Sequence, residues 1–239
     1  MPDLLFVSDV SPYRTADQPP TPAGTHESIG AAANAIAAIA ESTALSFRHI
    51  EGVAAASISE LERTRMLVLF TIGETPWTAQ QRLVIEERTA SGTLGLVGLH
   101  SATDSAYGWP AFGQLIGARF DGHPVTGEMS ITVVNPDHPA TAHLPSPWLF
   151  KEELYIFRSL VPDARVLLAV ELGSRPAAGA DTNDWSDPHV LPLAWCIERA
   201  STRTFYTALG HFSAAYEDPS FLQHLTGGIE WVLDSGKAE

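Results

Sequence analysis

Histidines at the ends of apolar runs are the residues of this chain best suited to chemistry. His100 directly follows the apolar run 94–99, and His211 follows the run 204–209 after a single glycine. Imidazole titrates near neutral pH and also binds metal ions, so several such side chains in one cleft would suit proton transfer or metal binding. Each histidine taken singly could equally be a polar turn residue that hydrogen-bonds to the backbone.

Glu153 is the carboxylate that we expect to work with these histidines. It stands beside Tyr155, and apolar neighbours of this kind could raise its pKa and suit it to act as a general base. The alternative is a solvated carboxylate at the edge of an element, as the adjacent Glu152 suggests. We therefore predict that His100 and Glu153 are the acid–base groups and that His211 polarises or binds a substrate oxygen.

Further side chains are expected to orient a substrate. Tryptophan faces stack on sugar rings while polar neighbours bond the hydroxyls, although any one tryptophan is also a common core residue. Asp104 could instead cap a helix, and Arg203 could form an ion pair on the surface. The predicted substrate-binding residues are Asp9, Ser101, Asp104, Trp109, His123, His138, Trp195 and Arg203.

Metal binding is an alternative that the sequence allows. His123 and His138 could meet across a hairpin, and Asp104 and Arg203 could support a site there. The chain has no HExxH motif, and its single cysteine, Cys196, cannot form a ligand pair. A divalent metal therefore remains an alternative, and no other cofactor is predicted.

The turn after 94–99 lacks a nucleophile. A strand–turn–helix elbow normally carries serine or cysteine at its apex, whereas the apex here is His100. Ser101 has no evident partner in the sequence, and Cys196 lies far away in an expected strand. Covalent catalysis at this turn is therefore disfavoured.

Strands and helices alternate in the first half of the chain. Short apolar runs predict strands at 4–8, 47–50, 66–72 and 94–99. Helical spacing, capping residues and an initial proline predict helices at 25–45, 57–63, 78–90 and 110–116. Capping boxes are expected at Ser59 with Glu62 and at Thr78 with Gln81. Strands that are apolar throughout indicate a parallel sheet covered on both faces.

The pattern of apolar and polar residues changes in the second half of the chain. Residues 128–134 alternate, 152–158 and 165–171 are apolar stretches, and 173–188 is a loop of Gly, Ala and Asp that includes Trp185. A hairpin is predicted from 193–198 and 204–209, and a closing helix at 219–233. With no internal repeat and no long linker, a single domain over 1–239 is expected.

Composition narrows the range of partners. The net charge is −14 with 14 Lys and Arg, which argues against nucleic acid or an anionic membrane surface as a partner. The first residues lack a secretory pattern, and no apolar stretch is long enough to span a bilayer. We expect a cytoplasmic protein with a small-molecule substrate, and a homo-oligomer is left open.

Several sequence blocks in order resemble one known family. They are GLHSATD (98–104), FDGHP (120–124), DHP (137–139), ELY (153–155), PLAW (192–195), RTFYTALGH (203–211) and GIEW (228–231). The chain resembles the ThuA-like (trehalose utilisation) family, within the class I glutamine amidotransferase-like superfamily. The blocks run in order from residue 98 to residue 231.

The resemblance implies a flavodoxin-like α/β three-layer sandwich with a mainly parallel central sheet. It also implies that His100 stands where true amidotransferases carry cysteine, so glutamine hydrolysis is not expected. Family members are associated with the use of trehalose and related disaccharides through keto-sugars made by a partner dehydrogenase. The leading hypothesis is therefore acid–base chemistry on a keto-sugar. The alternatives are a non-catalytic carbohydrate-binding or regulatory protein and a metal-dependent hydrolase.

Overall fold

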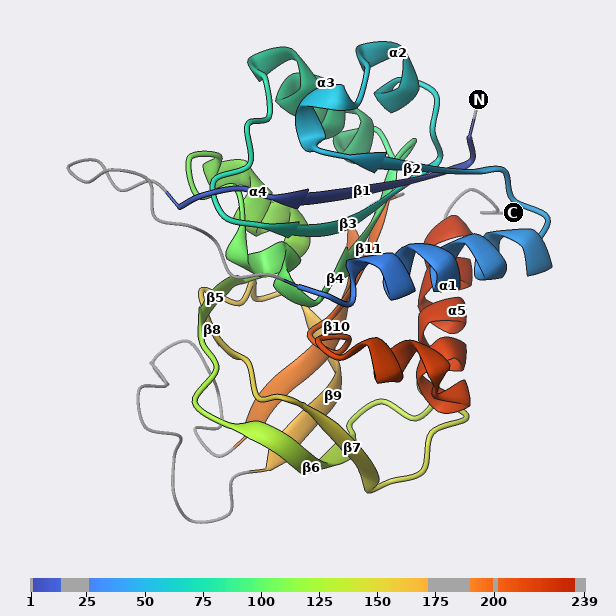
Figure 1. The fold of residues 1–239 in the computed structure, drawn as a ribbon, viewed down its shortest axis with the longest axis vertical. Helices are drawn as coiled ribbons and strands as arrows, with labels where there is room; N and C mark the ends of the chain where they lie inside the picture. The colour runs from blue at the N-terminus through green and yellow to red at the C-terminus, as the bar shows by residue number, and fades with distance from the viewer. Residues whose placement is uncertain (1, 14–25, 172–189, 200–201, 235–239) are drawn as a thin grey trace.

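The computed structural model describes residues 2–13, 26–171, 190–199 and 202–234 (Figure 1). The expected loop 173–188, with Trp185, lies outside the described residues. Within them, no helix is both long and apolar enough to cross a membrane.

A mixed β-sheet forms the middle layer. Its strands are β1 (Leu4–Val10), β2 (Phe47–Glu51), β3 (Met66–Ile72), β4 (Gly95–Leu99), β6 (Thr126–Val133), β7 (Trp148–Glu153), β9 (Arg165–Glu171), β10 (Val190–Arg199) and β11 (Thr202–Thr207). Among the described residues their order is β2-β1-β3-β4-β11-β10-β9-β6-β7. The five strands from β2 to β11 are parallel, and β10, β9, β6 and β7 continue the sheet in antiparallel pairs. Strands β5 (Arg119–Gly122) and β8 (Ile156–Arg158) pair separately.

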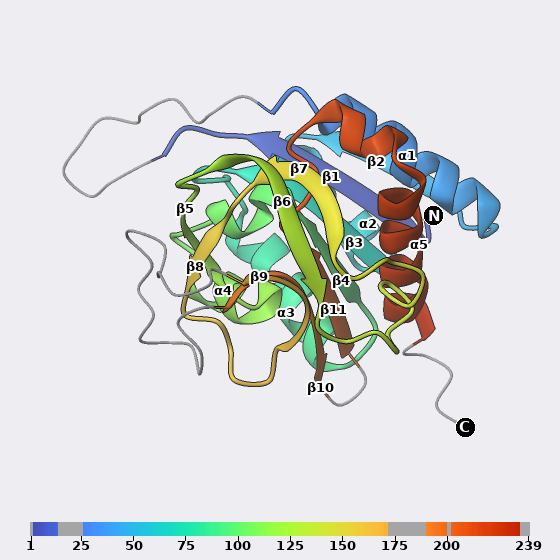
Figure 2. The same cartoon turned by 90° about the horizontal axis from the view of Figure 1, so that it is seen from below.

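Helices cover both faces of the parallel strands. They are α1 (Ile29–Ser42), α2 (Ile58–Leu61), α3 (Ala79–Ala90), α4 (Pro110–Ile116) and α5 (Pro219–Leu233). Two glycines of β4 show the layering, because a Cβ at position 95 would lie 2.3 Å from Val232 of α5, and one at position 98 would lie 2.4 Å from Ile116 of α4. Positions three apart in a strand face opposite sides. Figures 1 and 2 show α1 and α5 together on one face and α3 and α4 on the other, so the expected α/β three-layer architecture is confirmed.

The helix starts follow capping patterns, with one correction. Thr78 and Gln81 form the expected capping box of α3. The box at Ser59 and Glu62 is wrong, because α2 begins two residues earlier and the box is made by Ser57 and Glu60. The stretch 57–62 contains the Ser-x-x-Glu pattern twice, so the pattern alone could not fix the start of the helix.

Strands β4 and β11 are neighbours although a long stretch of chain separates them. Leu99 pairs with Thr207, so the turn after β4 lies beside the turn after β11. The chain between them builds α4 and β5 to β10 before it returns. This pairing brings His100 and His211 to the same edge of the sheet.

Candidate functional site

His100 occupies a strained turn directly after β4. Its φ is +45°, in the left-handed region that costs an ordinary side chain about 1–2 kcal/mol. The Tyr206 hydroxyl donates a 2.6 Å hydrogen bond to the His100 carbonyl oxygen and helps to hold this conformation. The 3₁₀ helix η2 (His100–Asp104) follows, so His100 stands at the apex of a strand–turn elbow.

The surroundings of the His100 ring fix its protonation. Nδ1 lies 2.7 Å from the carbonyl oxygen of Ala208, which can only accept, so Nδ1 carries the hydrogen. Nε2 lies 2.9 Å from the Tyr155 hydroxyl, which donates to it when the ring is neutral. Burial lowers the pKa of His100 well below its usual value. His100 is therefore a neutral imidazole with the lone pair of Nε2 facing the other histidines.

His211 follows a turn that Gly210 makes possible. Gly210 has a φ of +114°, and a Cβ there would lie 2.4 Å from the Tyr216 hydroxyl oxygen. The Glu152 carboxylate anchors this turn, because it accepts hydrogen bonds from the backbone N–H groups of Gly210 at 2.6 Å, His211 at 3.1 Å and Glu153 at 2.9 Å. Burial raises the pKa of Glu152 to about 7, and these N–H donors oppose the rise.

Replacement of Glu152 should loosen this turn. Glu152→Gln puts an amide NH₂ donor where backbone N–H donors converge, so we expect a loss of about 2–3 kcal/mol in the free energy of unfolding. The measurement is urea denaturation at pH 7.5. The control is Glu128→Gln on the adjacent strand β6, where the side chain is exposed and a change within about 0.5 kcal/mol is expected. Equal effects of the two substitutions would contradict the anchoring role.

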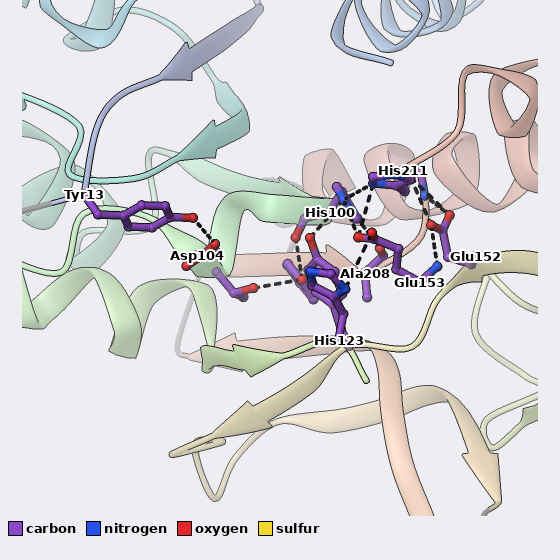
Figure 3. A network of polar contacts seen from close by, with 12 residues as sticks. Tyr13, His100, Asp104, His123, Glu152, Glu153, Ala208 and His211 are labelled. Atoms are coloured by element: carbon purple, nitrogen blue, oxygen red, sulfur yellow. Dashed lines mark hydrogen bonds and ion pairs between the residues drawn. The ribbon is translucent and has the colours of Figure 1, made fainter. Parts of the chain in front are cut away.

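Glu153 lies at the centre of the site (Figure 3). Its Oε2 is 3.2 Å from Nδ1 of His211 and 3.6 Å from Nε2 of His100, and its Oε1 is 3.7 Å from Nδ1 of His123. Burial favours the neutral acid, but the hydrogen bond and the charge of His211, with the charge of His123, outweigh it, so the pKa of Glu153 is lowered. The expectation of a raised pKa is therefore wrong, because imidazoles surround the carboxylate in addition to Tyr155.

The carboxylate acts on His211 in return. The hydrogen bond that Glu153 accepts from His211 raises the pKa of His211 against the opposing effect of burial. Nδ1 of His211 also lies 3.2 Å from Nε2 of His100, so the two rings are in contact. With Nδ1 bonded to the carboxylate, Nε2 of His211 has no hydrogen-bond partner among the described residues and is available to a ligand.

Exposure increases across the cluster. The side chain of His100 is 0% exposed, that of Glu153 10%, that of His211 26% and that of His123 50%. A ligand arriving from solvent would therefore meet His123 and His211 first and Glu153 next.

His26 completes the cluster and was missed by sequence reasoning. Its ring centroid lies 4.8 Å from that of His100 and 5.5 Å from that of His211. Both of its ring nitrogens are buried without a hydrogen-bond partner in the described residues. Burial lowers the pKa of His26 to about 4, so the ring is neutral. The residue stands ahead of α1 with no motif around it, and nothing in the sequence links it to residues 100 or 211.

Three other predicted site residues lie near the same edge of the sheet, but their side chains form no hydrogen bond with the histidine cluster in the part of the chain that the structure describes. Asp104 accepts hydrogen bonds of 2.5 Å from the hydroxyls of Tyr13 and Tyr107, and burial raises its pKa. Asp9 accepts from the N–H of Val53 at 2.7 Å and from the Ser11 hydroxyl, so it ties the end of β1 to the turn after β2. Ser101 is fully buried, and its hydroxyl has no partner among the described residues.

The structure places two expected substrate-binding tryptophans in the core. Trp195 is fully buried, stacks on Tyr206 at 4.2 Å between ring centroids and donates its Nε1–H to the carbonyl of Ile116. Trp109 is buried at the start of α4 and donates its Nε1–H to Glu86 at 2.5 Å. Neither ring face is available to a sugar, which corrects the expectation for both residues.

His138 and Arg203 are also separated from the site. Arg203 lies near the start of β11, at the opposite end of the sheet from His100, and bonds Glu198 and the carbonyl of Trp231. His138 is buried with its ring centroid 4.9 Å from that of Trp231. The alternative in which His123 and His138 meet across a hairpin is therefore excluded, since His123 contacts Glu153 and His138 packs against Trp231.

Comparison with known proteins identifies relatives of the chain. The model of the ThuA family, described as trehalose utilisation, matches residues 20–232. No curated protein matches the chain significantly. A ThuA-like protein from Bacteroides uniformis has a TM-score of 0.70 and 18% identity, covering 97% of this chain and 91% of its own. One from Parabacteroides merdae has a TM-score of 0.69 and 19% identity, covering 98% and 90%. PurLQS from Thermotoga maritima has a TM-score of 0.53 and 12% identity, covering 97% and 99%. At these identities the structural likenesses show the fold alone.

Proposed function

The chain belongs to the ThuA (trehalose utilisation) family, and on that premise we propose that it is an enzyme that moves a proton next to the carbonyl of a keto-sugar. The substrate class is trehalose or a related disaccharide with one ring hydroxyl oxidised to a ketone. A sugar dehydrogenase is the class of partner enzyme that would supply such a substrate. The observation that carries the proposal is the Glu153 carboxylate set among the rings of His100, His211 and His123.

Glu153 is the proposed base. Its lowered pKa keeps it ionised at neutral pH, so it is in the form that accepts a proton from the carbon beside the carbonyl. Triosephosphate isomerase, one of the standard examples of tuned acid–base chemistry, also pairs a glutamate base with an imidazole that polarises the carbonyl. A base of this kind contributes about 10²–10⁴-fold in rate.

His211 is the proposed group that binds the substrate oxygen. Its Nδ1 is held by Glu153, and no hydrogen bond or ion pair among the described residues uses its Nε2. The raised pKa of His211 supports a protonated ring, which stabilises the negative charge that develops on the oxygen. His123, half exposed and 3.7 Å from Glu153, would carry the proton between the carboxylate and solvent.

His100 takes a supporting role in this proposal instead of the acid–base role that the sequence suggested. Its Nδ1–H is committed to the Ala208 carbonyl, its Nε2 accepts from Tyr155, and its side chain has no exposed surface. It therefore suits positioning of His211 better than contact with a sugar. Proton return to the neighbouring carbon gives an isomer, and loss of an oxygen substituent from the next carbon gives elimination.

Proton NMR in D₂O tests the proposal. The protein is incubated with trehalose and with disaccharides that carry one ring ketone. We expect deuterium incorporation beside the ketone, or a new isomer or elimination product, and no change in trehalose itself. Binding of these sugars in calorimetry without any chemical change in NMR would overturn the enzyme proposal in favour of a carbohydrate-binding role.

A further inference from the structure

Both ring nitrogens of His26, at the deep end of the cluster, are buried without a hydrogen-bond partner among the described residues. Nε2 of His100 accepts from the Tyr155 hydroxyl at 2.9 Å, and Nδ1 of His211 lies 3.2 Å from the same nitrogen. A buried polar atom left without a partner is destabilising. A cation among the three rings would accept a lone pair from His26 and would replace the Tyr155 hydroxyl as the partner of Nε2 of His100.

The polar contact behind the His100 ring is that of a metal-binding histidine. Such histidines usually donate the second ring N–H to a backbone carbonyl or a carboxylate, which fixes the tautomer and the orientation of the ring. Nδ1 of His100 donates to the Ala208 carbonyl at 2.7 Å, which leaves Nε2 as its ligand atom. Glu153 also places a negative charge beside the centre of the cluster, where it would offset the charge of a dication.

The spacing of the rings is close to that of a ligand set. One ring nitrogen from each of His26, His100 and His211 can be chosen so that all three lie within 4.8 Å of one another. Around a tetrahedral zinc with Zn–N bonds of 2.0–2.1 Å, ligand nitrogens lie about 3.4 Å apart. Small side-chain rotations would close this difference.

We propose that His26, His100 and His211 bind one divalent transition-metal ion of the Zn²⁺ class. Three imidazole ligands suit Zn²⁺, Fe²⁺ or Ni²⁺, and the ion would displace the proton from His211, whereas Mg²⁺ and Ca²⁺ prefer oxygen ligands. Three protein ligands leave a further position open, as in catalytic zinc sites. This inference deepens the proposed function, since the ion would take over from His211 the binding of the substrate oxygen while Glu153 remains the base.

Two substitutions separate metal binding from folding. His100→Asn keeps an amide N–H for the Ala208 carbonyl and tolerates a φ of +45°, but it removes the Nε2 ligand. His26→Leu replaces two unpartnered nitrogens with carbon, so the metal-free protein should lose no stability. His143→Gln is the control, because His143 lies outside the cluster and bonds the Ser220 carbonyl.

The experiment titrates chelator-treated, tag-free protein with Zn²⁺ in competition with a chromophoric chelator, and follows the melting temperature in parallel. We expect one Zn²⁺ per wild-type chain, affinity lowered by about 100-fold or more in His26→Leu and His100→Asn, and wild-type affinity in His143→Gln. Zn²⁺ should raise the melting temperature of the wild type, and Mg²⁺ should not. Absence of stoichiometric Zn²⁺ binding by the wild type, or wild-type affinity in both cluster variants, would overturn the proposal.

No sugar is present in this titration, so its outcome is independent of the NMR experiment. Zn²⁺ binding together with unchanged keto-sugars would reject the proposed function and leave the metal site standing. Sugar turnover by protein that binds no Zn²⁺ would reject the metal site and leave the proposed function standing.

Discussion

Glu153→Gln is expected to lower kcat on a keto-sugar substrate by about 10²–10⁴-fold, because the amide cannot accept a proton from carbon. The amide oxygen still accepts from Nδ1 of His211, so the cluster should keep its shape. The measurement is steady-state kinetics together with deuterium exchange at the carbon beside the ketone. Exchange should be lost while binding of the sugar in calorimetry remains.

The control for this substitution is Glu171→Gln, which removes an exposed carboxylate at the end of β9 and should leave kcat unchanged. A fall in kcat/KM that arises only from KM would indicate a binding role for Glu153. Wild-type kcat in Glu153→Gln would end its assignment as the base.

His224 should make folding sensitive to acid. It is fully buried on α5, with Nδ1 donating to the Ala140 carbonyl at 2.7 Å and Nε2 accepting from the Thr207 hydroxyl at 3.2 Å. Burial, helped by the charges of His143 and His138, lowers its pKa from 6.5 to about 3. The unfolded chain thus binds a proton more readily than the folded one. The stability that His224 contributes is complete above pH 6.5 and is lost as the pH falls toward 3.

Comparison of wild type with His224→Asn isolates this effect, since the other titrating groups are common to both proteins. The asparagine keeps a donor for the Ala140 carbonyl but does not titrate. We expect the wild type to be the more stable at pH 7.5, and its advantage to shrink by about 3 kcal/mol at pH 4.5. Urea denaturation at both pH values gives the difference. An advantage that does not change with pH would show that His224 has no such role.

The part of the site on the sheet edge could be predicted from the sequence. His100 and His211 each follow an apolar run, and the carboxyl ends of parallel strands meet at one edge. The same reasoning applied in reverse would have excluded Arg203, because a residue that precedes a parallel strand lies at the other edge. Trp195 was misplaced because its position in a strand does not tell which face is covered, and here the ring is stacked on Tyr206.

Two residues of the cluster could not be found in this way. His26 stands ahead of a helix and reaches the site through the packing of α1, which leaves no periodic signal in the sequence. Glu152 and Glu153 are adjacent carboxylates with opposite shifts of pKa. Burial raises the pKa of Glu152 although backbone N–H groups of a turn almost sixty residues away oppose the rise, whereas the imidazoles around Glu153 lower its pKa. The sequence shows only two adjacent glutamates, so it cannot distinguish these two environments.

The pairing of β4 with β11 has a consequence for how this protein can diversify. Imidazoles from the two flanking turns are fixed by the parallel strands, whereas Glu153 and His123 arrive on the long excursion between those strands. Remodelling of the excursion around His123 can therefore reshape the exposed rim for another ligand while the strand pairing keeps the two histidines side by side. The strands that fix the histidines and the segment that would determine the choice of ligand are thus separate stretches of one chain.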